Sequence, residues 1–193
     1  ILNQKVEKLK QVSNSYNVTT SDQTEICSKC ILIAAGNGAF GPNKPPLKDI
    51  EQFEDKSIFY SVRDKNMFKG KKIAIAGGGD SAVDWAIELS KITSKIFFIH
   101  RRAKLRASPA NVKKLYDLEK KGKLEMVIPY QLDSIIGNNG EIDMLVVRDL
   151  ENNVKNIKAD FFLPFFGLSN ELGPIKEWEL DIEKKGIVVE QST

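Results

Sequence analysis

The sequence has little of several things that commonly reveal a protein's class. With two cysteines in 193 residues, it lacks the cysteine density of an oxidised, secreted scaffold. No apolar run approaches the roughly 18 residues that a membrane-spanning helix requires, and no secretory signal pattern is visible. The formal net charge is only +3, which does not indicate nucleic acid as a partner. We therefore expect a cytoplasmic protein that binds neither membrane nor nucleic acid, and we predict no metal site.

The chain contains 41% hydrophobic residues, enough for one substantial core. One segment, which begins at residue 72, indicates a function more clearly than any other. The apolar residues Lys72–Ala76 predict a strand, and a helix is predicted from about Asp80. Gly77, Gly79 and Ala82 fill the pattern G-x-G-x-x-A, in which glycine permits a tight turn and lets the backbone approach a pyrophosphate. The start of the helix would direct its free N–H groups at that pyrophosphate. This segment predicts a dinucleotide-binding site.

A second apolar strand, residues 96–99, ends at the position that usually sets the nucleotide specificity of such a site. A unit specific for NAD carries Asp or Glu there, about 20 residues after the glycines, for the ribose hydroxyls. This chain has His100, Arg101 and Arg102, with Arg106 four residues later. A carboxylate would repel a 2′-phosphate, whereas guanidinium groups bind one bidentately. Two charge-assisted hydrogen bonds of roughly 1.5–3 kcal/mol each would favour NADP by on the order of a hundredfold.

The predicted ligand is therefore NADP(H). Taken alone, a basic run is more often a solvated face or a nucleic-acid patch. Because this run follows the second strand of a dinucleotide-binding pattern, we favour binding of the 2′-phosphate instead. His100 is the only histidine, and we expect it to shape the site without carrying proton chemistry. No catalytic residue is predicted.

The order of turns and apolar runs predicts one domain inserted between two incomplete flanks. Residues 40–46 contain glycine and three prolines and indicate a linker, and the chain changes character again after residues 167–170. We expect segments 1–41 and 167–193 to be pieces of a second domain that is split by the unit 42–166, and we expect the first residue to be a cut point because it is not methionine. The predicted fold class is α/β: a Rossmann-like three-layer domain with a parallel sheet and a β-meander, plus fragments of the split domain.

Periodicity within these segments predicts the individual elements. Strands are expected at residues 1–10, 16–20 and 24–35, and together they are expected to form a small antiparallel ribbon. The third has a turn near its start and leads into a buried strand that ends at residues 35–38. In the inserted unit we predict a short strand or loop over 57–62, helices over 81–91 and 108–121, strands over 72–76, 96–99, 124–128 and 160–166, and a meander over 131–136, 142–148 and 154–158.

Cys27 and Cys30 form a C-x-x-C pair. A redox pair of this kind places its first thiol near a helix N-terminus, where the thiol pKa is lowered. Here the surrounding residues predict a strand or strand-turn, and positions i and i+3 of one strand point to opposite faces, which would prevent a disulfide. We favour a structural interpretation and keep a redox pair as the alternative.

The motifs resemble the two-dinucleotide flavoprotein superfamily that includes thioredoxin reductase. The resemblance rests on GGGDSAVDWA at residues 77–86 and HRRAKLRA at 100–107, and it covers essentially the whole chain. In that superfamily an inserted NADPH domain splits an FAD domain, which implies that segments 1–41 and 167–193 belong to the FAD domain. ILIAAG at 31–36 and DFFLPFFG at 160–167 resemble the motifs at which the chain leaves and rejoins it.

Within the superfamily the chain is similar to the thioredoxin-reductase-like ferredoxin (or flavodoxin)–NADP⁺ reductases. Thioredoxin reductases carry a redox C-x-x-C shortly before the glycine motif, where residues 58–68 of this chain contain no cysteine. AGNGAF at 35–40, YSVRD at 60–64 and LGPIKEWELDI at 172–182 match the reductase pattern. The resemblance implies an enzyme that transfers hydride between NADPH and FAD and exchanges electrons with ferredoxin or flavodoxin, with a homodimer as one option for its assembly.

The resemblance also implies which residues bind cofactors. The start of the helix would hold the pyrophosphate, the arginines would hold the 2′-phosphate and flank the adenine, and the two connections would touch FAD in the full-length parent. The predicted residues are Gly77, Gly78, Gly79, Asp80, Ser81, His100, Arg101, Arg102 and Arg106 for NADP(H), with Phe40 and Gly167 at the connections. The family's N-terminal FAD fingerprint and later G-D motif have no counterpart here, so this chain alone should bind NADP(H) without retaining FAD. A disulfide reductase that uses Cys27 and Cys30, and an NADP(H)-binding module without turnover, remain alternatives.

Overall fold

The computed structural model describes residues 2–34, 39–183 and 186–190. The chain divides into two compact units, one formed by Ile1–Gly41 together with Leu168–Thr193 and the other by Pro42–Gly167. None of the described helices has the length and hydrophobicity that a bilayer crossing requires.

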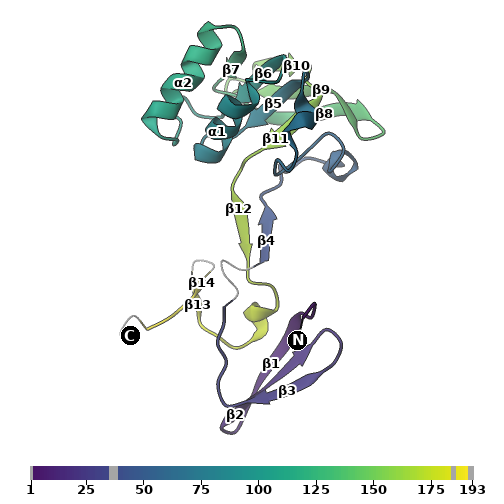
Figure 1. Cartoon of the computed structure of the whole chain (residues 1–193), viewed down its shortest axis with the longest axis vertical. Helices are drawn as coiled ribbons and strands as arrows, with labels where there is room; N and C mark the ends of the chain where they lie inside the picture. The colour runs from purple at the N-terminus through teal and green to yellow at the C-terminus, as the bar shows by residue number, and fades with distance from the viewer. Residues whose placement is uncertain (1, 35–38, 184–185, 191–193) are drawn as a thin grey trace. The chain divides into compact units, whose positions relative to one another are not determined.

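The unit Pro42–Gly167 is built on a parallel sheet with the strand order β11-β5-β6-β7 (Figure 1). The strands are β5 Lys72–Ala76, β6 Lys95–Ile99, β7 Leu124–Val127 and β11 Phe161–Pro164. Helix α1, Asp80–Leu89, connects β5 to β6, and helix α2, Pro109–Lys120, connects β6 to β7. Because every pairing in this sheet is parallel, all four strands end at the same edge.

The two faces of this sheet belong to two different cores, because successive side chains of a strand point to opposite sides. Ile73 and Ile75 of β5 pack on one side with the buried faces of α1 and α2. Ala74 and Ala76 pack on the other side with an antiparallel meander, whose strands are β8 Gln131–Asn138, β9 Glu141–Arg148 and β10 Val154–Ile157. Figure 1 shows the helices and the meander on opposite sides of the sheet. The predicted three-layer α/β fold is confirmed.

Most of the elements predicted in this unit are confirmed, with boundaries shifted by at most two residues. Helix α1 buries Ala82, Val83, Ala86 and Leu89, and α2 begins after its N-cap residue Ser108 with Pro109. Residues 57–62 form a loop in which Ile58 bridges to Phe162. Two short 3₁₀ helices, η1 Ile50–Phe53 and η2 Lys65–Phe68, were not predicted.

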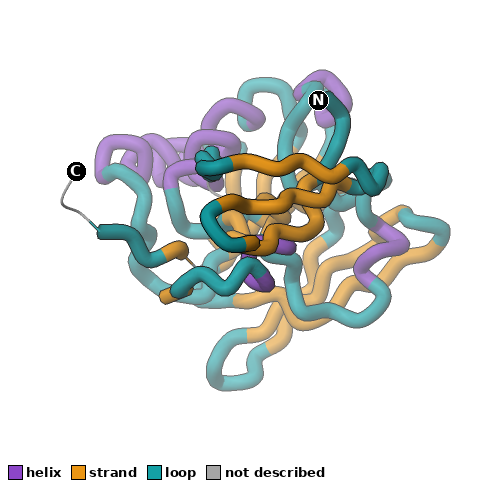
Figure 2. Tube along the Cα trace, turned by 90° about the horizontal axis from the view of Figure 1, so that it is seen from below, coloured by secondary structure: helices purple, strands orange, loops and turns teal. Residues whose placement is uncertain are grey.

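The other unit contains an antiparallel sheet of β1 Val6–Val12, β2 Ser15–Thr20 and β3 Glu25–Ser28. Strands β4 Ala39–Pro42 and β12 Leu168–Glu171 pair with each other. The helix η3 Gly173–Glu177 and a small pair, β13 Ile182–Glu183 and β14 Gly186–Ile187, follow. Figure 2 shows the strands of the chain in orange.

The prediction of one buried strand that runs to residue 35 is wrong for the residues that can be compared. The strand β3 ends at Ser28, residues 31–34 have no strand structure, and the Leu32 side chain is 90% exposed. The apolar composition of this run predicted a strand, but a strand also needs a neighbouring backbone to bond. The described residues provide no strand that pairs with it. Residues 35–38, where the predicted strand would end, lie outside the described part of the chain.

Candidate nucleotide-binding site

A cavity of about 470 Å³ lies at the sheet edge where the four parallel strands end. Each strand contributes the residues that follow it to the lining: Gly77 after β5, His100 after β6, Tyr130 shortly after β7, and Phe165 after β11. In open α/β sheets, ligands bind in the crevice outside the carboxyl ends of the strands. The topology therefore places this cavity where a ligand is expected.

Gly77 forms the turn between β5 and the helix. Its N–H donates to the Ile99 carbonyl at 3.1 Å. A Cβ at this position would lie 2.7 Å from the Phe165 carbonyl oxygen and 2.8 Å from the Cβ of Ala82. No side chain fits between these atoms, so glycine is required for the strand and helix to approach. Gly79 is the N-cap residue of α1 and meets no such obstacle.

Gly78 joins the glycine turn to the segment that carries the arginines. Its carbonyl oxygen accepts hydrogen bonds from the Arg106 N–H at 2.6 Å and the Ala107 N–H at 3.2 Å. On its other side, a Cβ would lie 2.3 Å from Cε1 of His100. The two motifs that the sequence placed about 20 residues apart are therefore in direct contact through this glycine.

His100 is a packing residue with a neutral imidazole. Partial burial lowers its pKa, a hydrogen bond with the Lys104 backbone raises it, and the nearby guanidinium groups of Arg101, Arg106 and Arg102 lower it again, so that its pKa falls below the ordinary value. Its Nε2 atom is buried and has no hydrogen-bond partner among the described residues. The imidazole is therefore uncharged at neutral pH.

The cationic end of the cavity has no internal counter-ion. Arg101, Arg102, Lys104 and Arg106 all line it, whereas no Asp or Glu does among the described residues. None of these four side chains forms an ion pair within the described part of the chain. Guanidinium groups that lack a carboxylate are available for an anionic ligand, and they match a phosphate bidentately.

Gly79, Asp80, Ser81 and Gly167 are not among the residues that line the cavity. Asp80 and Ser81 open helix α1, and the Asp80 Oδ1 atom accepts from the Ser108 N–H at 2.9 Å. Gly167 has φ +86° and its carbonyl accepts from the Asn43 N–H at 3.0 Å, at the point where the chain leaves the unit. Phe40 lies on β4, and its side chain is outside the described part of the structure.

The structure adds a wall that the motifs did not identify. Pro45 and Pro46 line the cavity together with Tyr130, Gln131 and Leu132. The signal that could have identified the last three is topological, because they follow a strand whose end faces the glycine turn. The two prolines were interpreted only as a linker.

Lys44, the residue before Pro45, takes part in a partly buried set of polar contacts. The Lys44 ammonium pairs with Glu54 Oε2 at 2.7 Å, and the Tyr60 hydroxyl donates to Glu54 Oε1 at 2.6 Å. Partial burial raises the pKa of Glu54, but the hydrogen bonds from Lys44 and Tyr60 outweigh it, so the pKa is lowered overall. Burial and the bond to Glu54 raise the pKa of Tyr60.

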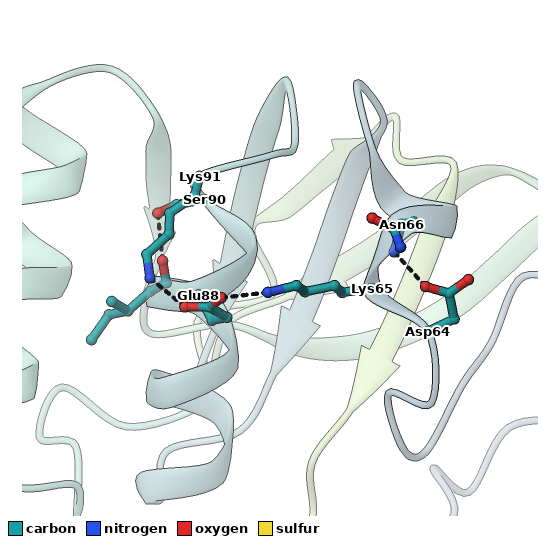
Figure 3. Close-up of polar contacts among 7 residues, drawn as sticks. Asp64, Lys65, Asn66, Glu88, Ser90 and Lys91 are labelled. Atoms are coloured by element: carbon teal, nitrogen blue, oxygen red, sulfur yellow. Dashed lines mark hydrogen bonds and ion pairs between the residues drawn. The ribbon is translucent and has the colours of Figure 1, made fainter.

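Helix α1, which starts at the glycine turn, is also anchored at its far end (Figure 3). Glu88 accepts a hydrogen bond from Lys65 of η2 at 2.9 Å and pairs with Lys91. These hydrogen bonds, with the one from Lys91 the stronger, lower the pKa of Glu88 to about 2. In the same view, Asp64 caps η2 by accepting from the Asn66 N–H at 2.9 Å.

Cys27 and Cys30 are both free and exposed. The argument that one continuous strand separates them is wrong, because β3 ends at Ser28 and Cys30 lies beyond it. The Ser28 hydroxyl donates to the Cys30 carbonyl at 2.5 Å and bends the chain there. No group of three or more possible metal ligands occurs in the described ranges.

Comparisons with known proteins identify the family of this chain. A family model described as pyridine nucleotide-disulphide oxidoreductase matches residues 1–193. The chain belongs to this family.

Curated members with similar sequences bear the name ferredoxin–NADP reductase. The protein from Rickettsia canadensis is 52% identical over 191 residues, and that from Rickettsia bellii is 51% identical over 189. These matches cover 99% and 98% of this chain but only 57% of each relative. The chain therefore spans little more than half the length of the reductases it resembles, and the resemblance drawn from the motifs is confirmed.

Solved structures show the same fold at low sequence identity. A Lactococcus lactis thioredoxin reductase has a TM-score of 0.83 at 22% identity, and that of T. acidophilum has 0.81 at 21%. Each match covers 97% of this chain and 60% of the other. At this identity the likeness concerns the fold alone.

Proposed function

We propose that the cavity at the carboxyl edge of the parallel sheet binds NADP(H). The observation that carries this proposal is the contact between the glycine turn and the arginine segment through Gly78. A dinucleotide that follows the sheet edge would meet free N–H groups at the start of α1 and then the guanidinium groups of Arg101, Arg102 and Arg106. The absence of a lining carboxylate among the described residues fits a ligand with an additional phosphate.

We further propose that the chain is part of an FAD-dependent ferredoxin–NADP⁺ reductase. The names of the Rickettsia relatives and the family assignment support this activity. On this proposal, the unit 42–166 is the NADP(H)-binding domain, and segments 1–41 and 167–193 belong to the FAD domain, with Phe40 and Gly167 at the flavin side. The full-length protein would be cytoplasmic, would use ferredoxin or flavodoxin as its partner, and could assemble as a homodimer.

In this mechanism the residues described here bind and orient, while the cofactors carry the redox chemistry. FAD, when bound to the full-length protein, would exchange hydride with the nicotinamide. The arginines select the nucleotide, the glycine turn with Gly79 and the first residues of α1 accommodates its pyrophosphate, and Pro45, Pro46 and Tyr130 form part of the cavity wall. No acid, base or nucleophile is required from this chain.

The test compares NADPH with NADH by titration calorimetry. Replacing Arg101→Ala together with Arg102→Ala should weaken NADPH binding by on the order of a hundredfold and NADH binding far less, because only NADPH carries the 2′-phosphate. As a matched control, Lys113→Ala with Lys121→Ala removes two exposed charges that do not line the cavity. Equal losses for the two nucleotides, or an equal loss in the control, would contradict the proposal.

A further inference from the structure

Asp80 occupies a position where a ligand contact was expected, yet its carboxylate is engaged within the protein. It is the first residue of α1 and follows the N-cap residue Gly79. Its Oδ1 accepts from the backbone N–H of Ser108 at 2.9 Å. Ser108 is the N-cap residue of α2 and ends the arginine loop, by which we mean residues 100–108. Asp80 therefore bonds the far end of the loop from which His100 and the basic residues Arg101, Arg102, Lys104 and Arg106 line the cavity.

This bond is one of three at the same place. The Gly78 carbonyl accepts from the N–H groups of Arg106 and Ala107, at 2.6 and 3.2 Å. Three consecutive N–H groups of the arginine loop, from residues 106, 107 and 108, are thus held by Gly78 of the glycine turn and Asp80 of α1. We call this set of three hydrogen bonds the loop clamp.

The chemistry of the clamp does not suit direct contact between Asp80 and the ligand. A carboxylate beside a pyrophosphate would repel it, since both are anionic. Bound to a backbone N–H, the same charge forms a strong, short-range hydrogen bond. Asp80 does not line the cavity, whereas Arg106 at the clamped end of the loop does.

We propose that Asp80 is a positioning residue that holds the arginine loop, and Arg106 in particular, in place for the second phosphate of the nucleotide. The inference rests on the proposed NADP(H) function. The arginine side chains are exposed and unpaired within the described residues, so only the backbone of the loop fixes where they start. A loop ordered before binding spares the ligand the cost of ordering it.

A structural role in joining the two helices is the competing explanation, and the chain contains a matched control for it. Asp84 lies one turn further along α1 and accepts from the Asn111 side-chain amide of α2 at 2.7 Å. It links the same helices without contacting the arginine loop. Asp84→Ala therefore removes a comparable link and leaves the clamp intact.

The experiment measures the ratio of NADPH to NADH affinity by calorimetry in the full 193-residue chain. Asp80→Ala should lower this ratio by about three- to tenfold, the cost of ordering one or two side chains on binding. Asp80→Asn keeps an acceptor oxygen and should preserve the ratio, although loss of the charge can strengthen binding of both nucleotides equally. Asp84→Ala should leave the ratio unchanged.

A second variant removes the donor instead of the acceptor. Ser108→Pro eliminates the N–H that Asp80 binds, and proline fits the φ of −57° found there. It should lower the ratio as Asp80→Ala does. Amide hydrogen exchange without nucleotide gives an independent readout, in which the N–H groups of Arg106 and Ala107 exchange faster in Asp80→Ala than in Asp84→Ala.

The outcomes separate this inference from the function on which it depends. If the unmodified chain shows no preference for NADPH, the proposed function fails. If the preference is present and Asp80→Ala and Ser108→Pro both retain it, or if Asp84→Ala lowers it equally, the positioning role of Asp80 is refuted while the nucleotide site stands.

Discussion

His100 lies against Gly78 so closely that a Cβ on the glycine would stand 2.3 Å from the imidazole Cε1. Gly78 does not have a positive φ, so its backbone would accept another residue. Glycine is required at this position because the imidazole ring of His100 occupies the space that a side chain would need. The pair sets the spacing between the glycine turn and the arginine loop.

Gly78→Ala should lower the free energy of unfolding by about 1–3 kcal/mol, the usual cost of overfilling a packed site. Adding His100→Ala should recover part of that loss, because it removes the ring that the new methyl group meets. Urea unfolding of the two single variants and the double variant measures the coupling. Gly79→Ala, where a Cβ meets nothing within 4 Å, is the control. Strictly additive effects of Gly78→Ala and His100→Ala would show that the two residues do not compete for space.

Glu88→Gln should lower the melting temperature slightly at pH 7, by a few degrees at most, since exposed ion pairs contribute little. The pKa of Glu88 is lowered from 4.5 to about 2. A carboxylate with a lowered folded-state pKa stabilises above its unfolded pKa, and that contribution disappears as the pH falls from about 4.5 towards 2. The difference between the variant and the unmodified chain should shrink over this range. Glu141→Gln, which removes an exposed carboxylate that forms no ion pair in the described structure, is the control.

Tyr60→Phe should lower the free energy of unfolding by about 1–2 kcal/mol, because it deletes a hydrogen bond to a charged carboxylate. The pKa of Tyr60 is raised above its ordinary value of 10.0, so the folded state holds this proton more tightly than the unfolded state. Its contribution is complete below pH 10 and declines as the pH rises further. Chemical unfolding at pH 7 and pH 10.5 tests both points. Tyr116→Phe, at an exposed position of α2, serves as the control.

Replacing Cys27→Ser and Cys30→Ser together in the full-length protein should leave NADPH-dependent reduction of ferredoxin unchanged. Neither thiol lines the cavity, and both are free. Spectrophotometric assay with ferredoxin, and with an artificial dye as acceptor, gives the measurement. Loss of either activity would favour the alternative of a disulfide reductase.

The parts of the site that consecutive residues encode were predictable. Gly77, Ala82 and the arginines follow from a strand–turn–helix–strand pattern whose order places them at one sheet edge. The orientation of Asp80 was not predictable, because its partner Ser108 lies 28 residues away and is brought near only when α1 and α2 pack together. The spacing of a motif shows where a residue lies in the sequence, but it does not show which group its side chain will hydrogen-bond in the folded structure.

The strand expected up to residue 35 shows a similar limit. Ile31 and Leu32 are apolar, as residues of a buried strand usually are. Whether a strand forms also depends on a second segment that pairs with it, and the composition of one segment does not show whether such a partner is present. The meander over β8 to β10 was predicted more accurately, because its strands alternate and the tight turn between the first two contains Asn139 and Gly140, which favour hairpins.

The strands β5 and β11 are neighbours in the sheet, although the residues that are hydrogen-bonded at their start, Lys72 and Asp160, lie 88 positions apart in the sequence. The Lys72 N–H donates to the Asp160 carboxylate at 2.7 Å, and the Asp160 N–H donates to the Lys72 carbonyl at 2.8 Å. During synthesis on the ribosome, β5 is followed shortly by its partner β6, but its other partner, β11, is made much later. At typical synthesis rates its other side waits roughly 4–18 s for β11, with an unpaired, aggregation-prone edge. Completion of this parallel sheet is thus coupled to translation of its final strand, and a stall before residue 161 would leave that edge of β5 unpaired.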